Sequence, residues 1–287
     1  MRGSRQSFVS PEEALAVCEM TVRRSDPDRY FASLFARAGK RPLLFVLYAF
    51  NHEIARAAEV AREPMMAEIR LLWWREAVDE ARQGRPRAQP AAIGLAELIG
   101  RGGISAGALE ALIDARGGEI PSAPFADLTA LQAHADATSG ALMRIAASVL
   151  GWDGELDELT REAGTAYAIA GILRAIPFHA VRGKTFLPAD MLAAEGLTAN
   201  NAVSAPNNEN LKKAVSDLAE IAQEHFRRAR RIGIPRQVLP AVLPASLVPT
   251  YLTHATRRSR DILRDASDVS LFRRQLILLR AAAFGRL

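Results

Sequence analysis

The stretch that decides the fold of this 287-residue chain covers residues 171–188 and reads GILRAIPFHAVRGKTFLP. Its first half is mostly apolar and continues a helical pattern that begins near residue 155. Pro177 lacks a backbone N–H and clashes with the preceding turn, so we expect it to kink or end that helix. The basic turn Arg182-Gly183-Lys184 follows, and the stretch closes on Phe186-Leu187-Pro188.

The rest of the chain also has the periodicity of helices. Ser10-Pro11-Glu12-Glu13 is a helix start with a serine cap, an early proline and a glutamate three residues after the cap. Further helices are predicted at about 41–59, 65–82, 91–100, 105–115, 125–150, 155–175, 211–231, 236–259 and 268–284. Breaks are predicted at 83–90, 117–118, 151–154 and 199–210, where glycine, proline or asparagine gather. No alternating strand pattern or fixed-period repeat stands out, so we predict one all-α domain over residues 1–287.

The charge balance is basic, with a formal net charge of +5 and a sequence pI of about 9.8. Such a balance is typical of proteins that meet anionic partners, although a solvated surface is the bland alternative. No glycine loop for phosphate, zinc spacing or Ser/His/Asp signature stands out, and we expect no nucleic-acid partner. Cys18 is the single cysteine, so no intrachain disulfide is possible and a reducing, cytoplasmic location is expected.

Membrane contact is expected to be peripheral. The first residues are polar and lack the apolar region of a signal peptide. The run 42–50 is far shorter than the roughly 20 residues of a spanning helix. Residues 238–252 are apolar but interrupted by prolines, so they are expected to be buried or to lie on a surface. Together with a basic C-terminal region, they suggest attachment to an anionic inner leaflet; the rival interpretation is a core segment beside a solvated face. That region contains Arg257, Arg258, Arg260, Arg264, Arg273 and Arg274.

The stretch 171–188 resembles the second signature of the squalene/phytoene synthase family, roughly N-I-L-R-D-x-x-E-D-x-x-x-G-R-x-Y-L-P. The frame agrees at positions spread over the whole signature: Ile172, Leu173, Arg174, Gly183, Leu187 and Pro188. The resemblance implies an isoprenoid-synthase-type helical domain around a central cavity. In that family, carboxylates on facing helices hold Mg²⁺, and the ions stabilise the diphosphate that leaves when two prenyl diphosphates are joined head to head.

The acidic residues of the family signatures are largely missing here. In the second signature the aspartates become Ala175 and His179. The first signature, Y-x-x-C-R-x-x-D-x-x-x-D, aligns with residues 48–59, where the arginine becomes His52 and the first aspartate becomes Ala55. Glu59 keeps the only carboxylate at these positions, and it is a weak metal candidate. A shifted Glu59/Glu63 pair is disfavoured, because a residue before proline (here Pro64) avoids the helical region.

The residues at these positions resemble those of a closer subfamily, the squalene-synthase-like assembly factors of respiratory complex I and their bacterial relatives. That group has A-F-N-x-E-L-A at the first signature and R-A-x-P-Y-H followed by F-L-P at the second. Here the corresponding stretches are 49–55, 174–179 and 186–188. The resemblance implies a non-catalytic protein that binds a prenyl-like lipid or a protein partner, in respiratory-complex assembly, with no cofactor. The alternative is an active Mg²⁺-dependent transferase that condenses farnesyl or geranylgeranyl diphosphate at an atypical metal site.

The same register predicts which side chains line the mouth of the cavity. We expect one pocket to contain His52, Glu59, Arg174, His179 and Tyr251, with Arg182 and Lys184 contributing a basic turn. Because a buried arginine is costly without a counter-charge, Arg174 is expected to pair with Glu59.

Overall fold

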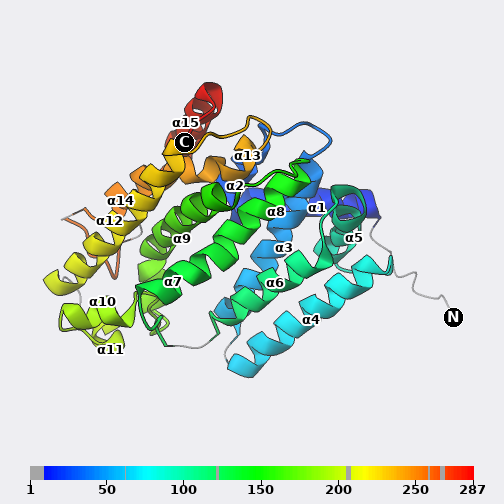
Figure 1. Ribbon diagram of the computed structural model, residues 1–287. Helices are drawn as coiled ribbons and strands as arrows, with labels where there is room; N and C mark the ends of the chain where they lie inside the picture. Colours follow the sequence, from blue (N-terminus) through cyan, green and yellow to red (C-terminus); the bar gives the residue numbers. More distant parts are fainter. Residues whose placement is uncertain (1–9, 62, 121–122, 205–207, 258, 266–268) are drawn as a thin grey trace. The chain divides into compact units, whose positions relative to one another are not determined.

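The structure is a computed structural model that describes residues 10–61, 63–120, 123–204, 208–257, 259–265 and 269–287 (Figure 1). Every regular element within these ranges is a helix, which confirms the all-α prediction. None of the helices in the described ranges is long and apolar enough to cross a bilayer. The expectation about a signal peptide concerns residues 1–9 and so lies outside the described part.

The chain divides into two compact units. The first comprises Met1–Gly117 with Ile145–Asp153, and the second comprises Gly118–Arg144 with Gly154–Leu287. The prediction of one domain over the whole chain stays a prediction. Six helices belong to the first unit: α1 (Pro11–Ser25), α2 (Pro27–Ser33), α3 (Arg41–Val60), α4 (Pro64–Arg82), α5 (Pro90–Gly102) and α6 (Ala106–Gly117).

Helix α3 is the centre of the first unit, with contacts to the other five helices (Figure 1). Its residues 43–50 are all buried, as expected for a helix that is apolar on most sides. The capping box at Ser10 forms as predicted: Glu13 N–H donates to Ser10 Oγ and Ser10 N–H donates to the Glu13 carboxylate. Cys18 in α1 is 1% exposed and lies in the core of this unit.

The second unit holds the remaining helices, several of them short. They are α7 (Leu128–Ala135), the π-helical turn η1 (Asp136–Gly140), α9 (Asp157–Ala180), α10 (Ala189–Ala194), α11 (Ala199–Ser204), α12 (Glu209–Arg231), α13 (Leu239–Val242), the 3₁₀ turn η2 (Leu243–Leu247), α14 (Val248–Ala255) and α15 (Leu271–Phe284). Helix α8 (Ala141–Val149) begins in this unit and ends in the first.

Helix α9 is the centre of the second unit and contacts α7, η1, α12, α13, η2 and α14. Its approach to η1 is close because both helices have a glycine where they meet. A Cβ atom built on Gly164 would lie 2.5 Å from the backbone N and Cα of Gly140. Pro177 does not end α9, which continues to Ala180.

Residues 238–252 form part of the core, so their expected role in membrane attachment was wrong. Val238, Leu247 and Val248 are fully buried, and Tyr251 is 1% exposed. Three prolines divide the stretch into α13, η2 and α14, each with proline in its first turn. This position costs little, because the N–H groups of a first turn have no partner within the helix.

The predicted break at 199–210 was partly wrong, because α11 occupies Ala199–Ser204. The short helices α2 and α10 were not predicted from the sequence. Short helices carry too few periodic positions to be told from turns by pattern alone.

Candidate functional site

The first signature lies on α3, in the first unit. His52 is half-buried, and burial lowers the pKa of its imidazole; Arg56 acts in the same direction, while the Glu53 and Asp26 carboxylates oppose it. Glu59 lies near the end of the helix and is exposed. This end of α3 therefore presents a neutral imidazole and a solvated carboxylate.

A buried tyrosine, Tyr48, lies one turn before His52 on α3, next to Arg29 of α2. Tyr48 is 2% exposed, and its hydroxyl has no hydrogen-bond partner among the described residues. The Arg29 guanidinium lies 5.6 Å from the centre of the Tyr48 ring and 2.6 Å from the Asp26 carboxylate. Burial raises the pKa of Tyr48, so the phenol stays protonated.

The second signature lies on the last turns of α9 and in the segment that follows. His179 stands where the family has an aspartate, and its ring packs against Phe186 and Phe178 with centroids 4.6 and 5.3 Å away. Burial lowers the pKa of His179 to about 4; Arg182 and Lys184 act in the same direction, and Glu119 opposes them. His179 is therefore neutral at pH 7.

His179 and Lys184 line one small cavity in the second unit. Its volume of about 10 Å³ has room for about one water molecule. Most of its wall is apolar, and the lining residues are Ile172, Ile176, His179, Lys184, Thr185, Phe186, Leu187, Ala202 and Val203. A prenyl chain does not fit in this cavity as it stands.

Arg174 and Tyr251 contact each other in the second unit. The Arg174 guanidinium lies 4.0 Å from the centre of the Tyr251 ring, across the contact between α9 and α14. Arg182 is exposed instead: it stacks on Phe178 at 3.6 Å and donates to the Phe178 carbonyl.

The structure thus brings together two pairs of the predicted residues, His179 with Lys184 and Arg174 with Tyr251. His52 and Glu59 belong to the first unit. Their convergence with the second-unit residues, and the pairing of Arg174 with Glu59, stay predictions.

The residues at the signature positions do not fit a magnesium site. Mg²⁺ needs oxygen ligands, and the second signature offers Ala175, a neutral histidine and the Lys184 cation. Within the described ranges, no three His, Cys, Asp or Glu side chains gather closely enough to hold a metal ion.

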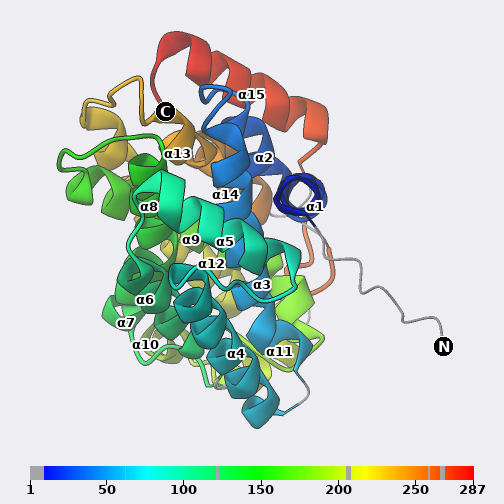
Figure 2. The ribbon, with the colours of Figure 1, turned by 90° about the vertical axis from the view of Figure 1, so that its right-hand side faces the viewer.

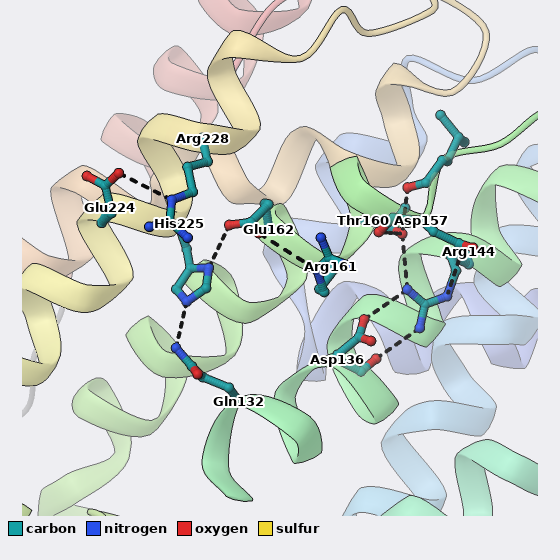
Figure 3. A network of polar contacts seen from close by, with 11 residues as sticks. Gln132, Asp136, Arg144, Asp157, Thr160, Arg161, Glu162, Glu224, His225 and Arg228 are labelled. Carbon is teal, nitrogen blue, oxygen red and sulfur yellow. Dashed lines mark hydrogen bonds and ion pairs between the residues drawn. The ribbon is translucent and has the colours of Figure 1, made fainter. Parts of the chain in front are cut away.

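A buried chain of hydrogen bonds joins three helices of the second unit and was not predicted from the sequence (Figure 3). The Gln132 amide nitrogen lies 2.9 Å from Nε2 of His225, and Nδ1 of His225 lies 2.7 Å from the Glu162 carboxylate. With the amide donating to Nε2, Nδ1 carries the hydrogen and donates to Glu162. Glu162 is 6% exposed. Glu162 falls on the apolar face of α9, between Leu159 and Ala166, and this position in the sequence could have indicated that its carboxylate is buried.

A second polar cluster joins η1, α8 and the first turn of α9 (Figure 3). The Arg144 guanidinium donates to the Asp136 carboxylate at 2.8 Å and to the Thr160 hydroxyl at 3.2 Å. It also donates to the Asp136 backbone carbonyl. Both clusters bind helices together within the second unit, and neither places a nucleophile next to a general base.

Comparisons with known proteins agree with this geometry. A profile of the squalene/phytoene synthase family matches residues 22–275. The chain is 29% identical over 238 residues to complex I assembly factor 6 of Bos taurus, covering 82% of this chain and 72% of the relative. It is 26% identical over 208 residues to presqualene diphosphate synthase of Rhodopseudomonas palustris, covering 70% and 73%. A dehydrosqualene synthase crystal structure superposes with a TM-score of 0.80 at 14% identity, covering 96% of this chain and 97% of the other.

Proposed function

The chain belongs to the squalene/phytoene synthase family, and we propose that it is a non-catalytic member that binds a protein partner during assembly of a respiratory NADH dehydrogenase. The observation that carries this proposal is the replacement of the metal-binding acids. Ala55, Ala175 and His179 stand at three of those positions, and His179 is held neutral among aromatic rings. The similarity to complex I assembly factor 6 supports the partner class.

Binding of a prenyl-like lipid is a further part of this proposal, and it requires the small cavity beside His179 and Lys184 to widen. The dehydrosqualene synthase with the same fold was crystallised with a ligand. In this chain the lipid would have a structural role, because Arg174 and Lys184 supply positive charge without the carboxylates that would hold the metal ions for diphosphate departure. The proposed location is the cytoplasm, at the inner face of the membrane that holds the enzyme complex.

The second candidate is a working prenyl diphosphate transferase, favoured by the similarity to presqualene diphosphate synthase. Product analysis separates the two functions. With farnesyl or geranylgeranyl diphosphate and Mg²⁺, we expect no squalene, phytoene or cyclopropyl intermediate, while an authentic synthase under the same conditions forms product. Turnover at an ordinary enzymatic rate would overturn the non-catalytic proposal.

Deletion of the gene tests the assembly role directly. We expect the amount of assembled NADH dehydrogenase on a native gel to fall in the deletion strain and to return with the wild-type gene. A gene for an authentic presqualene diphosphate synthase is the matched control and should not restore it. Normal assembly in the deletion strain, or restoration by the synthase, would contradict the proposal.

A further inference from the structure

The last helix, α15, belongs to the second unit (Figure 2). It carries a row of exposed apolar side chains. Phe272, Leu276 and Leu279 are 75%, 55% and 56% exposed. Their spacing of four and then three residues places them on one face of the helix. Large apolar side chains that gather on an exposed face are unusual for a surface that meets only water.

The opposite face of α15 anchors it to the protein. Leu278 and Ala281 are 1% and 8% exposed, and the helix packs against η2. Leu278 follows Leu276 by two positions, which is about 200° around a helix. The exposed row of Phe272, Leu276 and Leu279 therefore points away from the core that holds the helix in place.

Positive charge borders this row. Arg273 and Arg280 are exposed and fall on the same edge of the helix, seven residues apart. At the end of the helix, the Arg286 guanidinium lies 5.6 Å from the ring of Phe284, which is 65% exposed. Residues 271–287 contain no aspartate or glutamate. A helix that lies in a membrane interface typically has phenylalanine and leucine on one face and arginine beside them.

We propose that α15 lies on an anionic lipid bilayer, with Phe272, Leu276 and Leu279 among the acyl chains and Arg273 and Arg280 at the acidic headgroups. The charge argues against a second copy of this chain as the occupant. A two-fold contact would bring identical rows together and place their arginines side by side, with no acid on the helix to pair with them. This inference concerns where the chain docks and goes beyond the proposed assembly role, so either can fail without the other.

Sedimentation of the full chain with vesicles tests the proposal. The vesicles are phosphatidylcholine alone or mixed with phosphatidylglycerol. We expect binding to the acidic vesicles that fades with added salt, and none to the neutral ones. The triple variant Phe272→Ser/Leu276→Ser/Leu279→Ser should lower the partition coefficient on acidic vesicles by at least about tenfold, and Arg273→Gln/Arg280→Gln should lower it by a similar factor.

Helix α4 offers a matched control. Met65, Ile69 and Leu72 are 67%, 51% and 52% exposed and have the same spacing as the row on α15. They differ in charge, because α4 carries Glu68 and Glu76 among its arginines. The variant Met65→Ser/Ile69→Ser/Leu72→Ser should bind acidic vesicles within about twofold of the wild type, since α4 lacks the one-sided positive charge.

A labelled variant keeps the test independent of the triple variant's folding. Cys18 is buried, so Leu276→Cys provides one accessible thiol for an environment-sensitive dye. Acidic vesicles should shift the emission of the dye to the blue, and a lipid-borne quencher should reach it. The proposal is overturned if wild-type protein stays in the supernatant with both vesicle types at low salt, or if the α4 variant loses as much binding as the α15 variant. The proposal is also overturned if acidic vesicles leave the emission of the dye unshifted. A last contrary outcome is that the α15 triple variant changes the dimerisation measured by light scattering but leaves vesicle binding unchanged.

Discussion

The guanidinium of Arg174 lies 4.0 Å from the centre of the Tyr251 ring, and this contact joins α9 to α14. Arg174 is half-buried and Tyr251 is 1% exposed. Arg174, which the family signature also has at this position, thus meets an aromatic face. A cation over a ring face contributes about 0.5–2 kcal/mol, more where water is excluded.

A double-mutant cycle measures this contact. Arg174→Met keeps much of the stem and removes the charge, and Tyr251→Leu removes the ring. We expect a coupling of about 1 kcal/mol in the free energy of unfolding by urea. Tyr251→Phe is the control, and its coupling to Arg174→Met should be near zero because the ring face remains. Additive single and double variants would show that the stacking contributes nothing.

The closeness of Gly164 to Gly140 predicts opposite effects for two alanine substitutions on the same helix. Gly164→Ala places its Cβ 2.5 Å from backbone atoms, which cannot move as a side chain can, so we expect a loss of about 3 kcal/mol. Gly171→Ala meets nothing within 4 Å and should gain up to about 1 kcal/mol through helix propensity. Thermal and urea unfolding check both, and equal effects at the two positions would refute the packing argument.

Because the imidazole of His179 is buried, we expect the free energy of unfolding to decrease as the pH falls. Its pKa falls from 6.5 to about 4 on folding, chiefly through burial, so the unfolded chain binds a proton that the folded chain refuses. The stability that the neutral imidazole allows is fully present above pH 6.5, and the free energy of unfolding falls by about 3 kcal/mol as the pH falls to 4. The difference in unfolding free energy between wild type and His179→Asn should therefore change across this window. A constant difference would show that the imidazole is not the titrating group.

The chain of hydrogen bonds through His225 predicts that Glu162 is a structural carboxylate. Glu162→Ala removes the buried acceptor of His225 Nδ1, and we expect a loss of about 3 kcal/mol. Glu162→Gln keeps an acceptor oxygen and should lose about 1 kcal/mol. Glu220 on α12 is exposed and serves as the control: Glu220→Ala should stay within about 0.5 kcal/mol. Equal losses for Glu162→Ala and Glu220→Ala would mean that this chain of hydrogen bonds does not stabilise the fold.

Much of the fold could be predicted from the sequence because its signals are local. The capping box at Ser10, the apolar phase through Cys18 and the continuously apolar start of α3 depend on residues a few positions apart. The signature frame around Arg174 led to the family in the same way. The residues Ala175 and His179, which replace acids of the signature, are the basis of the non-catalytic proposal.

Which apolar residues are buried, and which polar side chains pair, depends on the tertiary structure. Residues 238–252 and the row on α15 are both rich in leucine; the first is buried and the second is exposed. Glu162 and His225 lie 63 positions apart, and no periodicity connects them. Helical periodicity is set by hydrogen bonds within a few residues, but burial and pairing depend on which helix faces pack together, and that is a property of the whole chain.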